Sequence, residues 1–477
     1  MARIAFCQNY AHEYLGLMYL SAALKKEGHK VDVFLYQGQG KKNFLSELSR
    51  FKPDLIGFYC ITGNFNWARE FSSLVKEALP VLTIFGGPHP TICPEIINEP
   101  SIDIVCRGEG ELTLSELAKK LGKKEDFSTL SGLWVKIGNK VFKNDLRPLI
   151  EDLDNLPFPD RDLYPKKYPF LQRSQKFFLA GRGCPFECSF CVHSAVRKLY
   201  QGKGRYVRFR QPSKVIDEIE FVKNNYFTRT VYMRDDTFIL NQNFIHNFAN
   251  EYHRRVALPL ICLVRADLLN EEVARNLHFA GCRKAFMGVE TGSEERREKI
   301  LKKKITNQQV YQAAALLKKY KIKFRAYNML GLPEETLNDA WETVKINNEI
   351  KPDYPYCFLF FPYPGTVLGE YAKTKGLVET ESLLNEPSYL IRSLISSPVK
   401  HELENLQKLF FYAVKFPWLS SLIKGLIRLR RNIFFDLAFV VSYTWCTAQS
   451  ENLRGKELFA FSGRLLNYFF NFRKNNK

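Results

Sequence analysis

The chain has 477 residues, of which 45% are apolar; this composition suits a globular protein and excludes an extended disordered one. Lys and Arg number 70 against 50 Asp and Glu, a net charge of +20. Such an excess is typical of proteins that meet nucleic acid, an anionic membrane surface or an anionic substrate, or that simply have a basic surface. No run of 18 uncharged apolar residues is present, so we expect no spanning helix, and we expect no secretory leader.

Residues 1–120 alternate between short apolar strands and amphipathic helices. This alternation predicts a doubly wound, Rossmann-like parallel sheet with helical crossovers. Ligands of such sheets bind at the carboxyl ends of the strands. The expected strands are 3–7, 30–35, 55–60, 81–85 and 102–106, and the expected helices are 15–27, 44–51, 67–78 and 111–121.

A less regular stretch follows, with a hairpin expected at 133–143 and then the proline-rich segment Leu156-Pro157-Phe158-Pro159. Clustered prolines mark connections between elements. We therefore expect a domain boundary between 150 and 170, with a first domain at 1–150 and a connector to about 175.

Residues 177–370 alternate again, in six strand–helix units that predict a partial (β/α)6 barrel of the TIM type. Chemistry in such barrels takes place at the C-terminal ends of the strands. From about residue 385 the alternation stops, and the sequence predicts helices rich in aromatic residues. The chain is thus expected to be an α/β protein with a barrel domain at 176–380 and a basic helical domain at 385–477. The expected barrel strands are 176–180, 229–233, 260–264, 283–288, 322–330 and 354–360.

Eleven cysteines are present, and eight of them are scattered singly, as expected of small buried apolar residues. The other three, Cys184, Cys188 and Cys191, have the spacing C-x3-C-x2-C. Three thiolates on one loop can hold three irons of a 4Fe-4S cluster and leave the fourth iron open to a non-protein ligand. Zinc prefers four ligands, and in that alternative His193 is the fourth.

This spacing, with the aromatic Phe190 before the last cysteine and a strand ahead of the loop, resembles the radical S-adenosylmethionine enzymes. The resemblance implies that the three cysteines bind a 4Fe-4S cluster whose open iron is chelated by S-adenosylmethionine. One electron from the cluster then cleaves S-adenosylmethionine to methionine and a 5′-deoxyadenosyl radical, which takes a hydrogen atom from the substrate. The resemblance also implies an electron donor such as flavodoxin or ferredoxin, and an anaerobic or reducing cytoplasm for the oxygen-labile cluster.

Motifs at the ends of the later barrel strands match the same family. The family usually has Gly at the position of Glu334, between Pro333 and Glu335, so the turn there is expected to differ. The residues that the resemblance assigns to S-adenosylmethionine are Phe190, Asp235, Asp236, Arg265, Glu290 and Gly331.

Two motifs of the first domain, Gly86-Gly87-Pro88-His89-Pro90 and Asp103-x2-Cys106-Arg107-Gly108-Glu109-Gly110-Glu111, resemble the cobalamin-binding domain that precedes many radical S-adenosylmethionine enzymes. Small residues after strands let the backbone approach a large flat ring. The residues that this resemblance assigns to cobalamin are Gln8, Asn9, His12, Thr62, Gly86, Gly87, Pro88, His89, Gly108 and Glu109.

The loop after the first strand departs from the cobalamin domains that give a histidine to cobalt. Those domains carry D-x-H-x-x-G, whereas this loop reads Tyr10-Ala11-His12-Glu13-Tyr14-Leu15-Gly16. The Asp is missing and the Gly falls one residue late. We therefore expect no protein histidine on the cobalt.

The combined resemblance implies a cobalamin-dependent radical methyltransferase, which moves methyl from methylcobalamin to an unactivated carbon of a substrate. Oxidative cyclisation or rearrangement on the same scaffold is the alternative. A tRNA methylthiotransferase would need three more cluster cysteines in a different N-terminal domain. A non-catalytic cobalamin sensor would not need an intact C-x3-C-x2-C motif.

Two regions carry much of the positive charge. Residues 197–210 hold six Lys or Arg and no acid, a pattern typical of contact with an anionic group on a small-molecule substrate, or of a solvated face. Residues 401–477 hold twelve Lys or Arg against five Asp or Glu, with sixteen aromatic residues. This second pattern indicates either a peripheral membrane contact, which would suit a lipid-linked substrate, or a helical cap on the barrel. Nucleic-acid binding is not expected.

Overall fold

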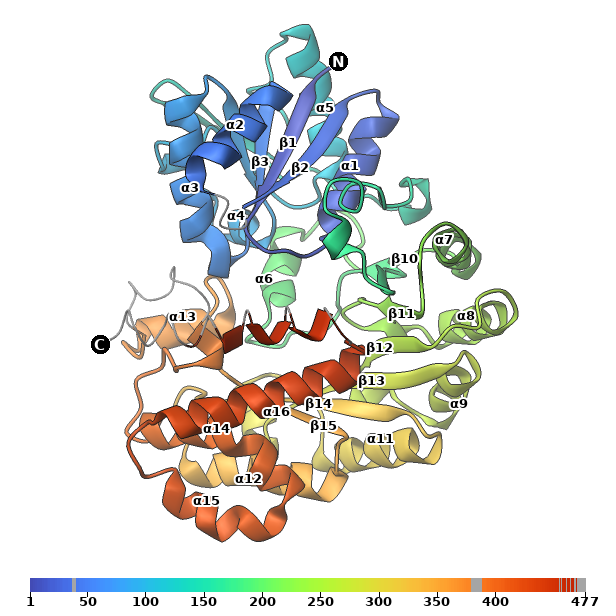
Figure 1. Cartoon of the computed structure of the whole chain (residues 1–477), viewed down its shortest axis with the longest axis vertical. Coiled ribbons are helices and arrows are strands. Elements are labelled where there is room, and N and C mark those ends of the chain that lie inside the picture. The colour runs from blue at the N-terminus through green and yellow to red at the C-terminus, as the bar shows by residue number, and fades with distance from the viewer. Residues whose placement is uncertain are drawn as a thin grey trace.

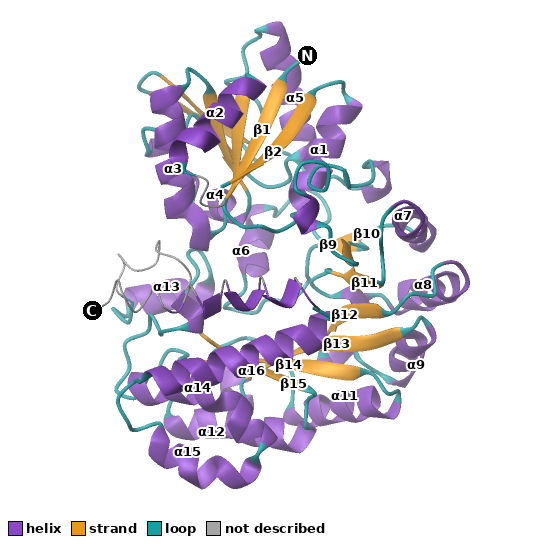
Figure 2. Ribbon diagram, in the orientation of Figure 1, coloured by secondary structure: helices purple, strands orange, loops and turns teal. Residues whose placement is uncertain are grey.

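The computed structural model describes residues 1–36, 40–378 and 388–453, together with 455, 457–459, 461–463, 465, 466 and 469. Two α/β bodies lie one above the other, and the C-terminal helices lie against the lower one (Figure 1). Figure 2 shows that each body has strands at its centre and helices around them. This arrangement confirms the fold class expected from the sequence.

The N-terminal body contains a seven-stranded sheet in the order β2-β1-β3-β4-β5-β6-β7, whose first five strands are parallel. The chain moves outward from β1 to β2, then returns to β3 on the other side of β1. This reversal creates a crevice at the carboxyl ends of β1 and β3. The strands are β1 (Arg3–Gln8), β2 (Lys30–Leu35), β3 (Leu55–Tyr59), β4 (Leu82–Gly86), β5 (Ile104–Cys106), β6 (Leu133–Ile137) and β7 (Lys140–Lys143).

Helices cover both faces of this sheet, because its parallel strands are apolar on both sides. On one face Leu24 and Leu117 are buried against Ile4, and on the other Phe44 and Phe71 share a core with Ile56. The helices are α1 (Leu15–Lys26) and α5 (Glu111–Lys123) on the first face, and α2 (Lys41–Phe51) and α3 (Phe65–Ala78) on the second. The expected hairpin is present, and β6 adds it antiparallel to the edge strand β5.

The second body contains six parallel strands in the order β15-β14-β13-β12-β11-β8, which is their order along the chain. Their bounds are β8 (Gln175–Phe178), β11 (Thr230–Met233), β12 (Leu260–Val264), β13 (Cys282–Glu290), β14 (Lys323–Leu330) and β15 (Tyr354–Leu359). The intervening helices are α7 (Pro212–Asn225), α8 (Gln242–Arg255), α9 (Glu271–Phe279), α10 (Glu294–Lys299), α11 (Asn307–Lys319) and α12 (Leu337–Ile350).

The strands of this partial barrel are apolar on both sides. Outward residues such as Val231 and Phe324 join the helices in the largest core, whereas Phe177, Tyr232 and Phe286 pack together on the inner side. Leu15, at the start of α1, is packed against this inner cluster. The N-terminal body therefore reaches the inner side of the barrel.

Three helices form most of the described C-terminal region: α14 (Lys400–Lys415), α15 (Ser420–Leu426) and α16 (Ile433–Glu451). Leu406 and Phe410 of α14 are buried with Leu359 of β15, so these helices do cap the barrel. Between α14 and α16 the chain forms a 3-10 turn (Pro417–Leu419) followed directly by the seven-residue α15. Within the described residues, no helix is both long and apolar enough to cross a bilayer.

Candidate functional site

The three cysteines lie on the loop between β8 and α6 (Val192–Leu199). The N–H of Cys191 donates to the carbonyl of Cys188 at 3.1 Å, and the N–H of Ser189 donates to the carbonyl of Leu301 at 2.9 Å. The loop is therefore a tight turn that is anchored to the far side of the barrel.

The surroundings of these thiols suit a bound cation. Burial raises the pKa of Cys191 to about 12, so its thiolate form needs a nearby positive charge such as iron. Burial also raises the pKa of Cys188, although Arg265, whose Nη1 lies 3.9 Å from its sulfur, opposes this. The sulfur of Cys184 is 3.5 Å from Thr237 Oγ1. Three soft thiolate donors on one turn fit a 4Fe-4S cluster.

The residues assigned to S-adenosylmethionine are distributed around this loop. The guanidinium of Arg265 lies 3.4 Å from the centroid of the Phe186 ring and is paired with Asp267. Asp235 is buried and accepts hydrogen bonds from the N–H groups of Ala180 and Gly181, so it fixes the chain before the cysteines. Gly331 has a φ of +78° and donates its N–H to Glu335.

A cavity of about 310 Å³ lies at the carboxyl ends of β13, β14 and β15. Phe190 and Glu290 line it, and they are the two members of the predicted S-adenosylmethionine set that do so. Glu290 is paired with Lys303 at 2.7 Å. Aromatic rings form most of the rest of the wall, from Tyr327, Phe358, Phe360, Phe361, Tyr363 and Tyr389.

A second cavity, of about 400 Å³, lies between the N-terminal sheet and the cysteine loop. Gly86, Gly87, Pro88, Gly108 and Glu109, five residues of the predicted cobalamin set, line it. Asp236, from the predicted S-adenosylmethionine set, also reaches it. The predictions for the two cofactors therefore meet at one place. The remaining wall is mostly apolar and includes Phe6, Leu17, Tyr19, Leu20, Tyr59, Ile84, Leu114, Leu149, Leu179 and Val196.

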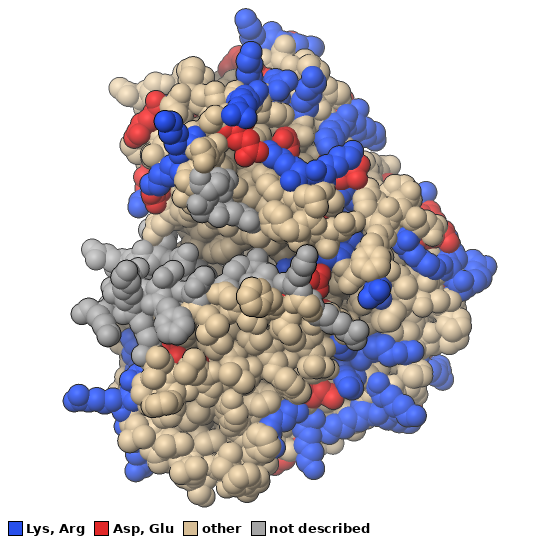
Figure 3. Space-filling model, in the orientation of Figure 1, with Lys and Arg blue, Asp and Glu red and all other residues tan. Residues whose placement is uncertain are grey.

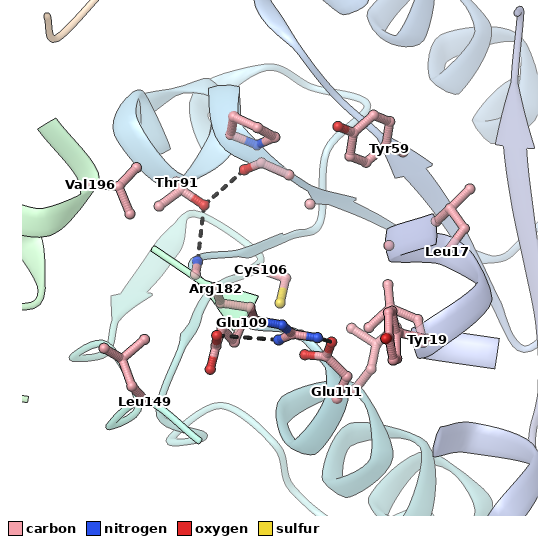
Figure 4. A pocket seen from close by; sticks show the side chains of 18 of the residues that line it. Leu17, Tyr19, Tyr59, Thr91, Cys106, Glu109, Glu111, Leu149, Arg182 and Val196 are labelled. Atoms are coloured by element: carbon pink, nitrogen blue, oxygen red, sulfur yellow. Dashed lines mark hydrogen bonds and ion pairs between the residues drawn. The ribbon is translucent and has the colours of Figure 1, made fainter. Parts of the chain in front are cut away.

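The glycines on the wall of this larger cavity leave the backbone exposed to it, because they have no side chain. Gly87 has a φ of +114°, and a Cβ on it would lie 2.7 Å from the carbonyl oxygen of Cys60. Thr91 links the two glycine loops, because its hydroxyl donates to the carbonyl of Gly87 and accepts from the N–H of Gly108 (Figure 4). An apolar chamber edged by bare backbone suits contact with a large flat ring such as the corrin of cobalamin.

The other five residues of the predicted cobalamin set surround the chamber without lining it. Gln8 is buried, donates to the carbonyls of Tyr10 and His12, and accepts from the hydroxyl of Tyr164. The ring of His12 packs against Tyr14 and Phe177. Nδ1 of His89 lies 3.3 Å from the Thr62 hydroxyl, and burial lowers the pKa of His89 to about 4. Asn9 Oδ1, by contrast, is buried without a hydrogen-bond partner in the described part of the chain.

A set of ion pairs joins the two bodies at the wall of the large cavity. Arg182, two residues before Cys184, pairs with Glu109 at 3.2 Å and with Glu111 at 2.6 Å (Figure 4). Arg208 pairs with Glu109 at 2.7 Å. Burial alone would raise the pKa of Glu109, but the hydrogen bond from Arg208 and the charges of both arginines outweigh it and hold that pKa below its usual range.

These pairs change the interpretation of the basic loop 197–210. Arg197 pairs with Glu187, Lys203 with Asp145 and Arg210 with Glu218. With Arg208 on Glu109, four of the six basic residues are matched to carboxylates of neighbouring segments. Much of the positive charge of this loop is therefore used in ion pairs within the protein.

Sequence reasoning missed the residues that come from the connections between motifs. Arg182, Tyr200 and Tyr206 line the large cavity; they lie beside the cysteine motif and within the basic loop, but no pattern of residue types marks them as lining a cavity. The aromatic wall of the smaller cavity left a signal in the sequence, because Phe360, Phe361 and Tyr363 follow β15 at the end where a barrel binds its ligands.

Comparison with known proteins places these two sites in a family. Residues 4–118 match the model of the B12 binding domain, and residues 178–346 match that of the Radical SAM superfamily. The chain is also 31% identical over 375 residues to an uncharacterized methyltransferase of Pyrococcus horikoshii, covering 77% of this chain and 80% of the relative. This chain belongs to the cobalamin-binding radical S-adenosylmethionine enzymes. Its cofactors are a 4Fe-4S cluster, S-adenosylmethionine and cobalamin.

Two further relatives show the range of this family. An anaerobic magnesium-protoporphyrin IX monomethyl ester cyclase of Rubrivivax gelatinosus is 28% identical over 365 residues, which cover 72% of this chain and 64% of the cyclase. The solved structure of the methyltransferase TsrM from Kitasatospora setae matches with a TM-score of 0.66 at 20% identity, covering 80% of this chain and 79% of TsrM. That match shows a shared fold. Membership of this family identifies the chain as an enzyme, not a non-catalytic sensor, and gives it a 4Fe-4S cluster as its metal group.

Proposed function

We propose that this enzyme transfers a methyl group from cobalamin to an unactivated carbon of an apolar small molecule. One observation carries the proposal: the large cavity belongs to both bodies. Gly86 and Gly108 of the N-terminal body line one side of it, and Gly183 and Val192, which flank the three cysteines, line the other. A methyl carrier and a radical source must share one chamber if the methyl group is to reach a substrate radical.

We further propose which residues hold the cofactors. Cys184, Cys188 and Cys191 are the iron ligands. Phe190, Asp236, Arg265, Glu290 and Gly331 surround S-adenosylmethionine, and Asp235 fixes the backbone beside it. The glycine loops Gly86-Gly87-Pro88 and Gly108-Glu109 receive cobalamin, while Gln8, Asn9, His12, Thr62 and His89 shape the loops below it. These sites come from proposed domains at 1–150 and 176–380, with a connector to about 175.

When bound, the cluster with S-adenosylmethionine supplies a 5′-deoxyadenosyl radical and cobalamin supplies the methyl group. The protein's own part is to position these groups and to keep water away. Arg182 ties the cysteine loop to Glu109 and Glu111 of the cobalamin body, so it sets the separation of the two sites. The apolar rings around both cavities exclude water from a radical that would otherwise react with the protein or solvent.

The walls also indicate the substrate class. The smaller cavity is formed mostly by aromatic rings, with Glu290 as its charged group, and Glu290 is already neutralised by Lys303. Four of the six basic residues after the cluster are paired with carboxylates. The space that S-adenosylmethionine leaves free in the smaller cavity therefore suits an apolar or aromatic part of the substrate, and any anionic groups of the substrate lie outside it.

Oxidative cyclisation is a second candidate, and the cyclase of Rubrivivax gelatinosus supports it as a relative of similar identity. Both candidates use the same cofactors. They differ in the fate of the methyl group of S-adenosylmethionine. A methyltransferase moves this group to the substrate, whereas a cyclase leaves it on S-adenosylmethionine or on the methionine released from it.

The deciding experiment uses the full chain, reconstituted anaerobically with iron, sulfide and hydroxocobalamin. Reduced protein is given S-adenosylmethionine with a deuterated methyl group, and mass spectrometry follows the label. We expect the label on the bound cobalamin and 5′-deoxyadenosine in solution. Cobalamin that binds but never acquires the label would reject methyl transfer in favour of cyclisation.

Cysteine variants test the radical half of the proposal. Replacing Cys184, Cys188 and Cys191 with Ala should abolish 5′-deoxyadenosine formation. The matched control is Cys446→Ala, which removes a buried thiol from α16 and should keep the cluster absorbance and the activity. Continued 5′-deoxyadenosine formation by the triple variant would overturn the assignment.

A further inference from the structure

Helix α16 is apolar on all sides, although it lies on the surface of the protein. One side is buried: Phe435, Phe439 and Cys446 contribute to the cores beneath it. The opposite side exposes Phe434, Leu437, Val441 and Trp445. These positions are three, four and four residues apart, so they form a single stripe along the helix. A helix that is apolar all round normally has both sides covered.

The exposed stripe continues onto the segment before it. Phe416, Trp418, Leu422, Leu429 and Ile433 are also exposed, with Trp418 at 77% and Phe434 at 76% of full exposure. Nine of the nineteen large exposed apolar side chains in the described chain lie between residues 416 and 445. Scattered exposed apolar residues are ordinary, but a concentration of this kind marks an interaction surface. We call these nine residues the C-terminal apolar surface.

Within the segment 416–445 that carries this surface, the exposed charges are positive. Lys424, Arg428 and Arg430 are exposed among the apolar residues. The acid between residues 416 and 450 is Asp436, which is buried and paired with Arg431 at 3.1 Å. Figure 3 shows the face over α14, α15 and α16 as a mostly uncharged area, with Lys and Arg and a few Asp and Glu side chains at its edges.

We propose that the C-terminal apolar surface docks on an anionic lipid bilayer. Exposed Trp side chains suit the boundary between headgroups and acyl chains, because the indole ring is apolar and carries one polar N–H, and the exposed Phe and Leu side chains add apolar area. Lys424, Arg428 and Arg430 lie among the apolar residues and would meet the negative surface of the membrane. The helix α16 lies flat on the protein, so it would lie in the plane of the bilayer as interfacial helices do.

A vesicle flotation assay tests this proposal with the full, cofactor-loaded chain. Vesicles of phosphatidylcholine with 30% phosphatidylglycerol are compared with vesicles of pure phosphatidylcholine. We expect the protein to float with the anionic vesicles and to bind them at least ten-fold more tightly than the neutral ones. Equal recovery with and without anionic lipid would overturn the electrostatic part of the proposal, and no flotation at all would overturn the whole.

Two variants locate the contact. Phe434→Gln with Val441→Gln removes apolar area, and Lys424→Glu with Arg428→Glu and Arg430→Glu reverses the rim charge; each should lower binding at least ten-fold. The matched control is Phe227→Gln with Phe279→Gln. Both rings are exposed, but they lie beside the barrel helices α7 and α9, so this variant should float like the parent. Unchanged binding by the first two variants would reject this surface as the contact.

A second copy of the chain is the competing occupant, and sedimentation distinguishes it. Without lipid we expect a monomer in analytical ultracentrifugation, for the parent and for the Gln double variant alike. A parent dimer that becomes monomeric in the double variant would assign the surface to dimerisation instead. Cluster absorbance and cobalamin content, measured in every variant, should stay at parent levels because no altered residue lies at either cavity.

Discussion

The hydroxyl of Tyr200 accepts a hydrogen bond from the backbone N–H of Glu109 at 3.1 Å. Tyr200 ends the helix that follows the cysteines, and Glu109 lies in the glycine loop after β5. The contact therefore joins the segment after the three cysteines to the glycine loop that lines the large cavity. It also leaves no room for a side chain at the neighbouring Gly108.

Gly108→Ala should damage this junction. A Cβ on Gly108 would lie 1.7 Å from the Tyr200 hydroxyl, and the backbone φ of +78° is itself unfavourable for alanine. Left-handed backbone alone costs about 1–2 kcal/mol, so we expect a clear loss of stability in denaturant titration and weaker cobalamin binding. Tyr200→Phe in the same chain should restore part of the loss, because it removes the closest atom. A Gly108→Ala variant as stable as the parent would contradict this geometry.

Gly86→Leu should weaken cobalamin binding without harming the fold. A Cβ at Gly86 would meet its nearest neighbour, Cys106, at an ordinary 3.7 Å, so the protein can accept a side chain there. The larger side chain would then occupy the cavity that Gly86 lines. We expect at least a ten-fold loss of affinity in hydroxocobalamin titrations, with a melting temperature near that of the parent. Gly425→Leu, a substitution into open space outside the cavity, is the control that should bind normally.

Glu109→Gln should destabilise the chain at neutral pH and much less in acid. Glu109 is paired with Arg182 and Arg208, and its pKa lies below the ordinary value because the arginines outweigh burial. A depressed carboxyl pKa adds stability above the unfolded-state pKa, and this stability is lost as pH falls through the folded-state pKa. Breaking such a partly buried pair costs about 3–5 kcal/mol. Denaturant unfolding of parent and variant from pH 7 to pH 3 should show a difference that shrinks only below the unfolded-state pKa near 4.5; a difference that stays constant down to pH 3 would argue against this contribution of Glu109.

His12→Ala should leave bound cobalamin spectroscopically unchanged. The ring of His12 packs on Phe177 and Tyr14 and does not line the large cavity. The visible spectrum of the reconstituted variant should therefore match that of the parent. A shift in the cobalamin bands on loss of this imidazole would show that His12 reaches the cobalt.

The sequence predicts this molecule best where one local pattern determines the structure. The alternation of apolar and polar residues and the position of Gly28 predict β2, β12 and α1 to within one residue of where they occur. The three cysteines and the two glycine motifs are likewise local. Arg182 could not be assigned in this way, because its role depends on Glu109 and Glu111 some 70 residues away. The basic loop was misleading for the same reason: its carboxylate partners lie in other segments.

Glu335→Gln should flatten the pH dependence of stability between about pH 5 and pH 8. Glu335 accepts hydrogen bonds from the N–H groups of Gly331 and Leu332, and burial raises its pKa to about 8. A carboxyl whose folded-state pKa is raised stabilises the fold below its unfolded value near 4.5, and that stability declines as pH rises toward 8. Each pKa unit corresponds to about 1.4 kcal/mol, so the parent, without S-adenosylmethionine, should lose at least that much more than the Gln variant across this range. Comparing the parent with the variant separates the effect of Glu335 from that of other buried groups such as Asp235. If the stabilities of the two proteins change by the same amount between pH 5 and pH 8, Glu335 is ionised throughout this range.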